Sequence, residues 1–79
     1  MENMMQEIQE AFRMTFNVEP QSITIETTPP DVAGWDSMGH VALASALETI
    51  FSVSFDVDEL MEMENVSKIV KIVGAKLEG

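Results

Sequence analysis

The stretch GWDSMGH, residues 34–40, stands between a proline pair and a long helical hydrophobic pattern. The prolines at residues 29–30 disfavour helix, whereas apolar residues after the stretch keep helical spacing as far as Phe51. Ser37 is therefore expected at the start of a helix, with Asp36 in the capping position. A hydroxyl group there lies near unpaired backbone N–H groups and the positive end of the helix dipole, which favours a bound or attached phosphate.

The pattern on either side of this stretch predicts helices joined by loops. Apolar residues at helical spacing indicate a first helix over residues 2–16 and a second over residues 37–51. One or two helical turns are expected within residues 56–63, and Asn65 is expected to cap the last helix. The predicted fold is an all-α, small four-helix bundle with three main helices and one short helix, and residues 1–79 form its single domain.

Residues 18–36 have no helical period, so they predict a long first loop. Loops of this length in a small domain usually have a function. Residues 23–25 alternate like a short strand, but no second strand is evident to pair with them. The expected apolar anchors of the loop are four residues: Ile23, Ile25, Val32 and Trp35.

Side chains expected in the core include Leu60 and Met61 from the short helix and Leu77 from the last one. The methionines at positions 38, 61 and 63 have two interpretations. They either fill the core, as methionine usually does, or form a pliable surface for a partner or an acyl chain.

Length and composition narrow the class of protein. With 79 residues, of which 46% are hydrophobic, the chain has room for one small core. The absence of cysteine excludes disulfides, thiolate zinc sites and a thiol nucleophile. No apolar run approaches the roughly 20 residues that span a bilayer, and the first residues lack the basic region of a secretory signal. A cytoplasmic location is therefore expected.

The charge of the chain is strongly acidic. Fourteen acidic residues against four basic ones give a formal net charge of −10. Nucleic acid and membrane surfaces are disfavoured as partners, because both attract basic residues. The charge favours proteins that carry basic patches, although it is equally compatible with a role in solubility alone.

Other chemistry has little support in the sequence. The residues around Ser37 partly match a hydrolase nucleophile elbow, but the first glycine is replaced by Trp35 and the chain is too short for that fold. The acidic residues 56–64 do not match a calcium loop, so no specific metal site is predicted. His40 is expected to be a solvated residue of the first helical turn, or alternatively an imidazolium close to a phosphate on Ser37.

The GWDSM segment, residues 34–38, resembles the prosthetic-group attachment motif of acyl carrier proteins. The similarity extends over nearly the whole chain, including ALE at residues 46–48, the pattern FxVxF at residues 51–55 and DEL at residues 58–60. The resemblance implies a four-helix bundle with 4′-phosphopantetheine joined to Ser37 as a phosphodiester. The terminal thiol of that arm would hold acyl groups as thioesters, which fits a chain without cysteine.

The resemblance also implies partners and a docking surface. The partners would be a phosphopantetheinyl transferase and enzymes that activate, condense or transfer acyl groups, and the carrier would act as a monomer without catalysing a reaction. Asp36 would help to present Ser37 to the transferase. The residues expected to dock partner enzymes are Met38, Val41, Ala42, Glu59 and Glu62.

The sequence departs from the pattern of fatty-acid carriers in the second helix. Acidic residues usually follow the serine there, whereas the first acid after Asp36 is Glu48. The short third helix is therefore expected to supply more of the charge for docking, as in a specialised carrier of a polyketide or related pathway. Two alternatives stay open, namely an acidic helical adaptor that is never modified and a carrier of aminoacyl groups.

Overall fold

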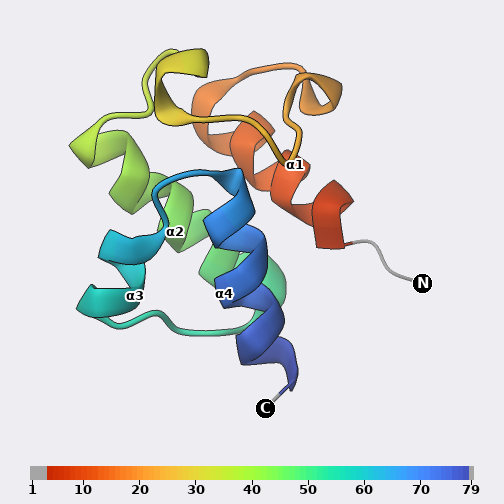
Figure 1. Ribbon diagram of the computed structural model, residues 1–79. Coiled ribbons are helices and arrows are strands. Elements are labelled where there is room, and N and C mark those ends of the chain that lie inside the picture. The colour runs from red at the N-terminus through yellow and green to blue at the C-terminus, as the bar shows by residue number, and fades with distance from the viewer. Residues whose placement is uncertain (1–3, 79) are drawn as a thin grey trace.

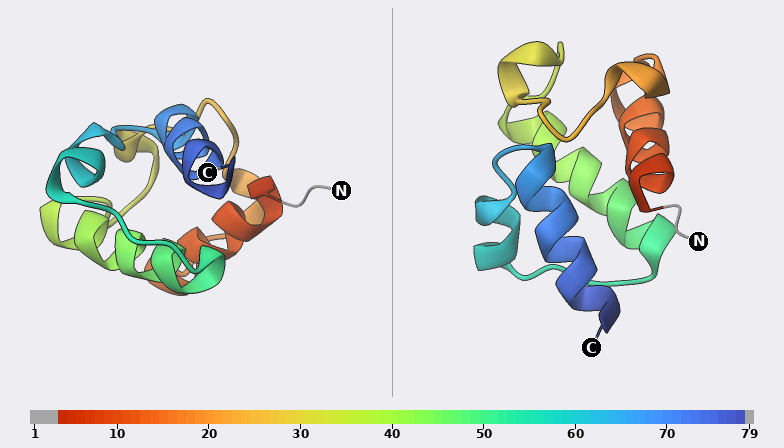
Figure 2. Two further views of the ribbon diagram at one scale, coloured as in Figure 1. Left: turned by 90° about the horizontal axis from the view of Figure 1, so that it is seen from below. Right: turned by 45° about the vertical axis from the view of Figure 1, so that its right-hand side comes forward.

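The computed structural model describes residues 4–78, which form four α-helices joined by a long first loop and two shorter connections (Figures 1 and 2). The helices are α1 (Met4–Phe16), α2 (Ser37–Phe51), α3 (Val57–Glu62) and α4 (Val66–Glu78). Residues 4–78 contain no strand, so the prediction of an all-α bundle with one short helix is confirmed. The expected first two residues of α1 lie outside the described residues.

The core forms where α1, α2 and α4 meet, and α1 and α2 make the most extensive helix pairing. Each of the three helices contributes side chains at helical spacing that are completely buried, which is the pattern of an amphipathic helix packed by one face. These residues are Ile8, Phe12, Leu43, Leu47, Val66, Ile69 and Val73. Among the described helices, none has the length and apolar content required to cross a membrane.

The first two helices end in left-handed residues, as many helices do. Asn17 has a φ of 58°, and its N–H donates to the carbonyl of Arg13 at 2.9 Å. Ser52 has a φ of 57° and follows the last turn of α2. The first helix therefore ends at Phe16, as its predicted range over residues 2–16 requires.

The first loop crosses the top of the bundle in Figure 1 and contains two 3-10 turns, Pro20–Ser22 and Pro29–Asp31. The buried Thr27 attaches it to the last helix, because its carbonyl accepts a hydrogen bond from the N–H of Val66 at 3.1 Å. Ile23 is buried as expected, but the prediction for Ile25 is wrong. Ile25 lies in the turn closed by Thr27 N–H and the Thr24 carbonyl, so its side chain is 46% exposed.

In the short helix α3, the prediction that Met61 points into the core is wrong, whereas the core interpretation of Met63 is confirmed. Met61 is 69% exposed, whereas Met63 is completely buried beneath the end of the helix. The helix has only six residues and ends at Glu62, so the helical period does not continue to Met63. The prediction that Leu77 belongs to the core is also wrong, because this residue lies in the last turn of α4 and is half-exposed.

In the connector from α2 to α3, burial alternates along the FxVxF pattern of residues 51–55. Phe51 is buried, Val53 and Phe55 are half-buried, and the residues between them are exposed. Glu48 holds this connector against α2, because its carboxylate accepts the N–H of Phe55 at 2.9 Å.

Candidate functional site

Ser37 is the first residue of α2, and its side chain is exposed. Asp36 caps the helix, since its carboxylate accepts the N–H of Gly39 at 2.9 Å. Gly34 precedes them with a φ of 94°, which favours glycine, and its carbonyl accepts the N–H of Asp36 at 2.9 Å. The predicted helix start and cap are confirmed, and the serine hydroxyl is placed at the amide-rich end of its helix.

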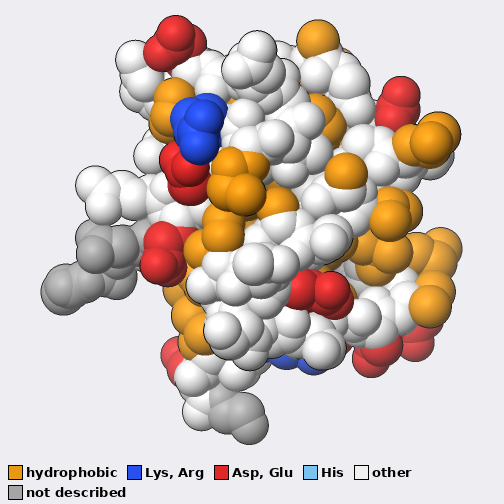
Figure 3. All heavy atoms as spheres, turned by 180° about the vertical axis from the view of Figure 1, so that it is seen from behind, with side chains coloured by type: hydrophobic (Ala, Val, Ile, Leu, Met, Phe, Trp, Pro, Cys, Tyr) orange, Lys and Arg blue, Asp and Glu red, His pale blue; other side chains and the backbone are white. Residues whose placement is uncertain are grey.

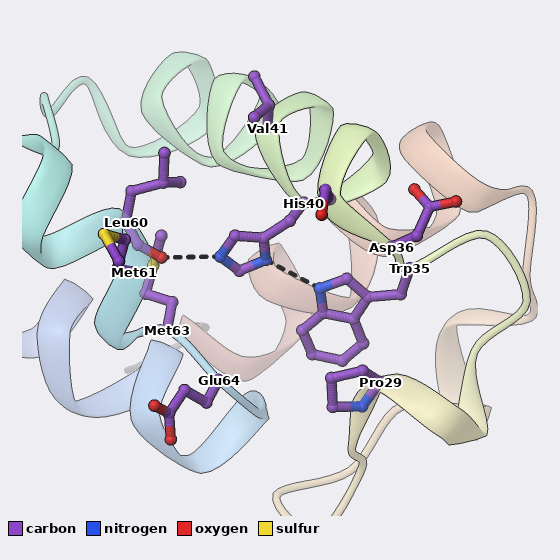
Figure 4. A pocket seen from close by; sticks show the side chains of 10 residues that line it. Pro29, Trp35, Asp36, His40, Val41, Leu60, Met61, Met63 and Glu64 are labelled. Atoms are coloured by element: carbon purple, nitrogen blue, oxygen red, sulfur yellow. Dashed lines mark hydrogen bonds between the residues drawn. The ribbon is translucent and has the colours of Figure 1, made fainter.

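A pocket of about 430 Å³ adjoins Ser37 (Figure 4). Its walls come from the first loop, from α2, and from α3 with the two residues that follow it. The lining residues are Pro29, Trp35, Asp36, Ser37, His40, Val41, Leu60, Met61, Met63 and Glu64. Most of these side chains are apolar, so the pocket suits an apolar group attached near Ser37.

His40 joins two of these walls through hydrogen bonds at both ring nitrogens (Figure 4). The indole N–H of Trp35 donates to Nδ1 at 2.9 Å, and Nε2 lies 2.8 Å from the carbonyl oxygen of Leu60. Because an indole nitrogen can only donate and a carbonyl can only accept, Nδ1 is unprotonated and Nε2 carries the hydrogen. His40 lies in the first turn of α2 as expected, but its ring is half-buried and hydrogen-bonded at both nitrogens rather than solvated. The alternative, an imidazolium close to a phosphate on Ser37, stays a prediction.

Trp35 is the aromatic centre of this region. Its ring packs edge-on against Phe12 with centroids 5.0 Å apart, and Phe16 lies 6.4 Å away. The ring of His40 is nearly parallel to the indole, at 6.2 Å and 15°. The side chain that directly precedes Asp36 and Ser37 is thus fixed by the core on one side and by His40 on the other.

Of the residues predicted to dock partners, Val41 lines the pocket, and the others lie on the same two helices, α2 and α3. Met38 is 84% exposed, Val41 is 57% exposed, and Ala42 is exposed beside them on α2. Figure 3 shows hydrophobic side chains gathered at the edge of the molecule where α2 and α3 lie, with acidic side chains next to them. Glu62 is exposed on α3 and adds a carboxylate to this edge.

Glu59 is more constrained than the other predicted docking residues. Its carboxylate is 2.7 Å from Nζ of Lys76 in α4, and it also accepts the N–H of Asp56 at 3.0 Å. The Lys76 hydrogen bond, followed by the backbone N–H of Asp56, lowers the pKa of Glu59 below its ordinary value. Glu59 therefore fastens α3 to α4 and closes the capping box of α3.

The remaining charges leave the pocket side of the molecule acidic. Neither α2 nor α3 contains a lysine or arginine. Three of the four basic side chains, those of Arg13, Lys68 and Lys76, are in ion pairs within the described part of the chain. Residues 4–78 bring together no group of three or more His, Asp or Glu side chains suited to hold a metal ion.

Comparison with known proteins finds a matching family model and a related acyl carrier protein. Residues 6–73 match the family model described as a phosphopantetheine attachment site. An acyl carrier protein of Coprothermobacter proteolyticus is 29% identical over 76 residues, which cover 96% of this chain and 93% of the relative.

Two further similarities concern a larger enzyme and a solved structure. A non-reducing polyketide synthase of Emericella nidulans is 41% identical over 44 residues, which cover 56% of this chain but only 2% of the synthase. The solution structure of a holo acyl carrier protein from Geobacter metallireducens superimposes with a TM-score of 0.84 at 28% identity, covering 98% of this chain and 88% of that one.

Proposed function

The chain belongs to the phosphopantetheine attachment site family, and we propose that Ser37 is the residue to which the arm is joined. The protein is an acyl carrier whose cofactor is 4′-phosphopantetheine. The family consists of carriers, so the chemistry of acyl transfer belongs to partner enzymes. In this interpretation the arm is a phosphodiester of the Ser37 hydroxyl, and its terminal thiol carries the acyl group as a thioester.

The position of Ser37 at the start of α2 is the observation that carries this proposal. The side chain is exposed, so a modifying enzyme can reach it. The N-terminus of a helix of 15 residues stabilises the negative charge of an attached phosphate. Asp36 is exposed as well and uses Oδ1 as the helix cap, which leaves its second carboxylate oxygen for the transferase or its metal ion.

The pocket beside Ser37 supports a second part of the proposal, the shelter of the acyl group. It has a volume of about 430 Å³ and a mostly apolar lining. A short acyl chain that returns from the arm would find this pocket next to its own attachment point. The pocket is open on one side, so a chain lying in it would be withdrawn from water over one face until a partner enzyme takes it up.

Synthase and transferase enzymes are the partners that a carrier of this family serves. We infer that they dock on the exposed Met38, Val41 and Ala42, with Glu62 and to a lesser degree Glu59 attracting basic patches. A tethered group then reacts at a high effective concentration in each active site. We further propose that the carrier serves a polyketide or fatty-acid pathway, that it is cytoplasmic and that it acts as a monomer.

Loading by a transferase tests the attachment site directly. The chain is incubated with coenzyme A, magnesium and a broad-specificity phosphopantetheinyl transferase, and the intact mass is recorded. We expect a gain of one phosphopantetheine group, its absence in Ser37→Ala and its retention in Ser45→Ala. Ser45 is a matched control because it is an exposed serine on the same helix.

Two outcomes of this experiment, and one of a subsequent acylation of the loaded chain, oppose the proposal. A gain that survives in Ser37→Ala would place the arm on another residue. No gain in the folded wild-type chain would favour an unmodified adaptor. Loading followed by acceptance of aminoacyl groups alone would identify the chain as an aminoacyl carrier.

A further inference from the structure

The imidazole of His40 links three parts of the molecule that meet at the pocket. Nδ1 accepts the indole N–H of Trp35 from the first loop, and Nε2 donates to the carbonyl of Leu60 in α3. His40 itself belongs to the first turn of α2. Attachment of the arm to Ser37 requires neither of these bonds, so the function proposed above does not account for them.

The two bonds respond differently to a proton. Nε2 carries its hydrogen in the neutral and the charged ring alike, so the bond to Leu60 persists. Nδ1 accepts a bond only while it is unprotonated. A proton there would place an N–H group against the indole N–H of Trp35 at 2.9 Å, and neither could accept. Protonation therefore breaks one particular bond and keeps the other.

Trp35 forms one wall of the pocket, and the bond to His40 restrains the orientation of its indole. The indole is 7% exposed and lines the pocket together with Pro29 of the loop. Its contact with Phe12 holds it from behind, whereas the bond to His40 holds its polar edge toward α2. A released indole keeps the aromatic contact but loses the restraint that fixes its orientation across the pocket.

We propose that His40 positions Trp35 as a movable wall of the pocket beside Ser37, and that a proton on Nδ1 of His40 releases this wall. Imidazole ordinarily changes its charge between about pH 5 and 8. The closed conformation excludes the proton from Nδ1, so it binds one proton fewer than the released conformation. Uptake of a proton at Nδ1 therefore shifts the population toward the released indole.

The surroundings of His40 are compatible with a charged ring. From α2 and its cap, Asp36 lines the same pocket, and Glu64 lines it from the segment after α3. The first loop contributes only Pro29 and Trp35 to this lining, and no described lysine or arginine is part of it. Figure 4 shows both carboxylates turned away from the imidazole, whose two nitrogens are bonded to Trp35 and Leu60 instead.

Release of Trp35 also has a consequence for the carrier, which rests on the proposed function. An acyl chain that displaces the indole from Nδ1 removes the obstacle to protonation of His40. By linkage, a proton on His40 then favours the occupied pocket to the same extent. The pocket would accept a chain more readily in mildly acidic surroundings.

The test uses the unmodified chain, so its result does not depend on the arm or on loading. The chain contains one tryptophan and one histidine, so the indole and imidazole resonances of the 15N-labelled protein are each unique. At pH 8 we expect the imidazole in its Nε2–H form. From pH 8 to 5 the indole N–H signal should shift in step with the protonation of His40. Its exchange with solvent should rise roughly five- to tenfold, as for the loss of one hydrogen bond.

Two variants reproduce the two conformations without titration. His40→Asn keeps an acceptor near the position of Nδ1, so its indole signal should resemble the closed form at every pH. His40→Phe keeps a ring without an acceptor, so its indole should show the released form at every pH. Far-UV circular dichroism should stay constant from pH 8 to 5 in all three proteins.

The proposal is overturned by any of four results. These are an imidazole in the Nδ1–H form at pH 8, an indole signal indifferent to the protonation of His40, a wild-type pH response retained in His40→Phe, and loss of helix over the same pH range. The last result would mean that the molecule unfolds rather than releases one wall. Failure of Ser37 to accept an arm would leave all of these measurements unchanged.

Discussion

The carbonyl oxygen of Gly34 lies where a side chain of residue 39 would begin, because a Cβ built on Gly39 would be 2.0 Å from it. The same Cβ would be 2.8 Å from the ring of Phe16. The backbone before Ser37 therefore passes directly against the first turn of α2. This close approach fixes the direction in which the loop enters the helix and, with it, the position of the serine.

Replacement of Gly39 by alanine is expected to destabilise the protein by about 1–3 kcal/mol, the usual cost of overpacking. Alanine normally stabilises a helix relative to glycine by about 0.5–1 kcal/mol. Gly74→Ala is the matched control, because a Cβ at this position meets only Met4, at 3.7 Å. This substitution should therefore stabilise the protein. Urea denaturation of both variants measures the difference. A Gly39→Ala variant as stable as wild type would show that the loop can move away at no cost.

Asp36 caps α2 and also carries a negative charge. Two substitutions at this position separate the two roles. Asp36→Ala removes the bond to Gly39 N–H and should lower the free energy of unfolding by about 1 kcal/mol, whereas Asp36→Asn should keep it nearly unchanged. If the free carboxylate oxygen serves the transferase, both variants should load the arm more slowly than wild type. Normal loading of Asp36→Asn would restrict Asp36 to its capping role.

The order of the helices and the start of α2 could be predicted from the sequence because their signals are local. A proline pair, an aspartate cap and apolar residues at helical spacing lie within a few positions of one another. The attachment motif lies in the same segment, so its location follows from the same residues.

The pocket could not be predicted, because one of its two defining bonds joins residues distant in sequence. His40 and Leu60 are 20 positions apart, and no periodicity relates them. The prediction for Met61 is wrong because a helix of six residues is too short for its period to identify a buried face. Gly39 did carry a signal, since glycine in a helical turn often marks a close approach of backbone.

The ion pair between Glu59 and Lys76 predicts an acid-dependent loss of stability. The Lys76 bond lowers the pKa of Glu59 in the folded state, so the folded chain binds fewer protons there than the unfolded chain. The resulting stabilisation is complete above the ordinary glutamate value of about 4.3 and disappears as the pH falls through the lower folded value.

Lys76→Met should therefore reduce stability at neutral pH and flatten the loss of stability below about pH 4.3. Lys71→Met is the control, since Lys71 is an exposed lysine of the same helix. Thermal denaturation at a series of pH values measures both effects. Equal pH profiles for the Lys76 variant and wild type would show that the bond to Glu59 contributes nothing.

The charge at the edge of α3 predicts how partner enzymes find the carrier. Glu62→Lys should raise the KM of a phosphopantetheinyl transferase about three- to tenfold with little change in kcat, because a charge at the rim acts mainly on encounter. Glu7→Lys changes the net charge equally at an exposed position of α1, on the opposite side of the molecule from α3 (Figure 1). Its KM should change much less. In 1 M salt, where screening acts within about 3 Å, the two variants should become alike. Equal increases of KM at low salt would instead indicate that net charge, rather than the docking edge, governs recognition.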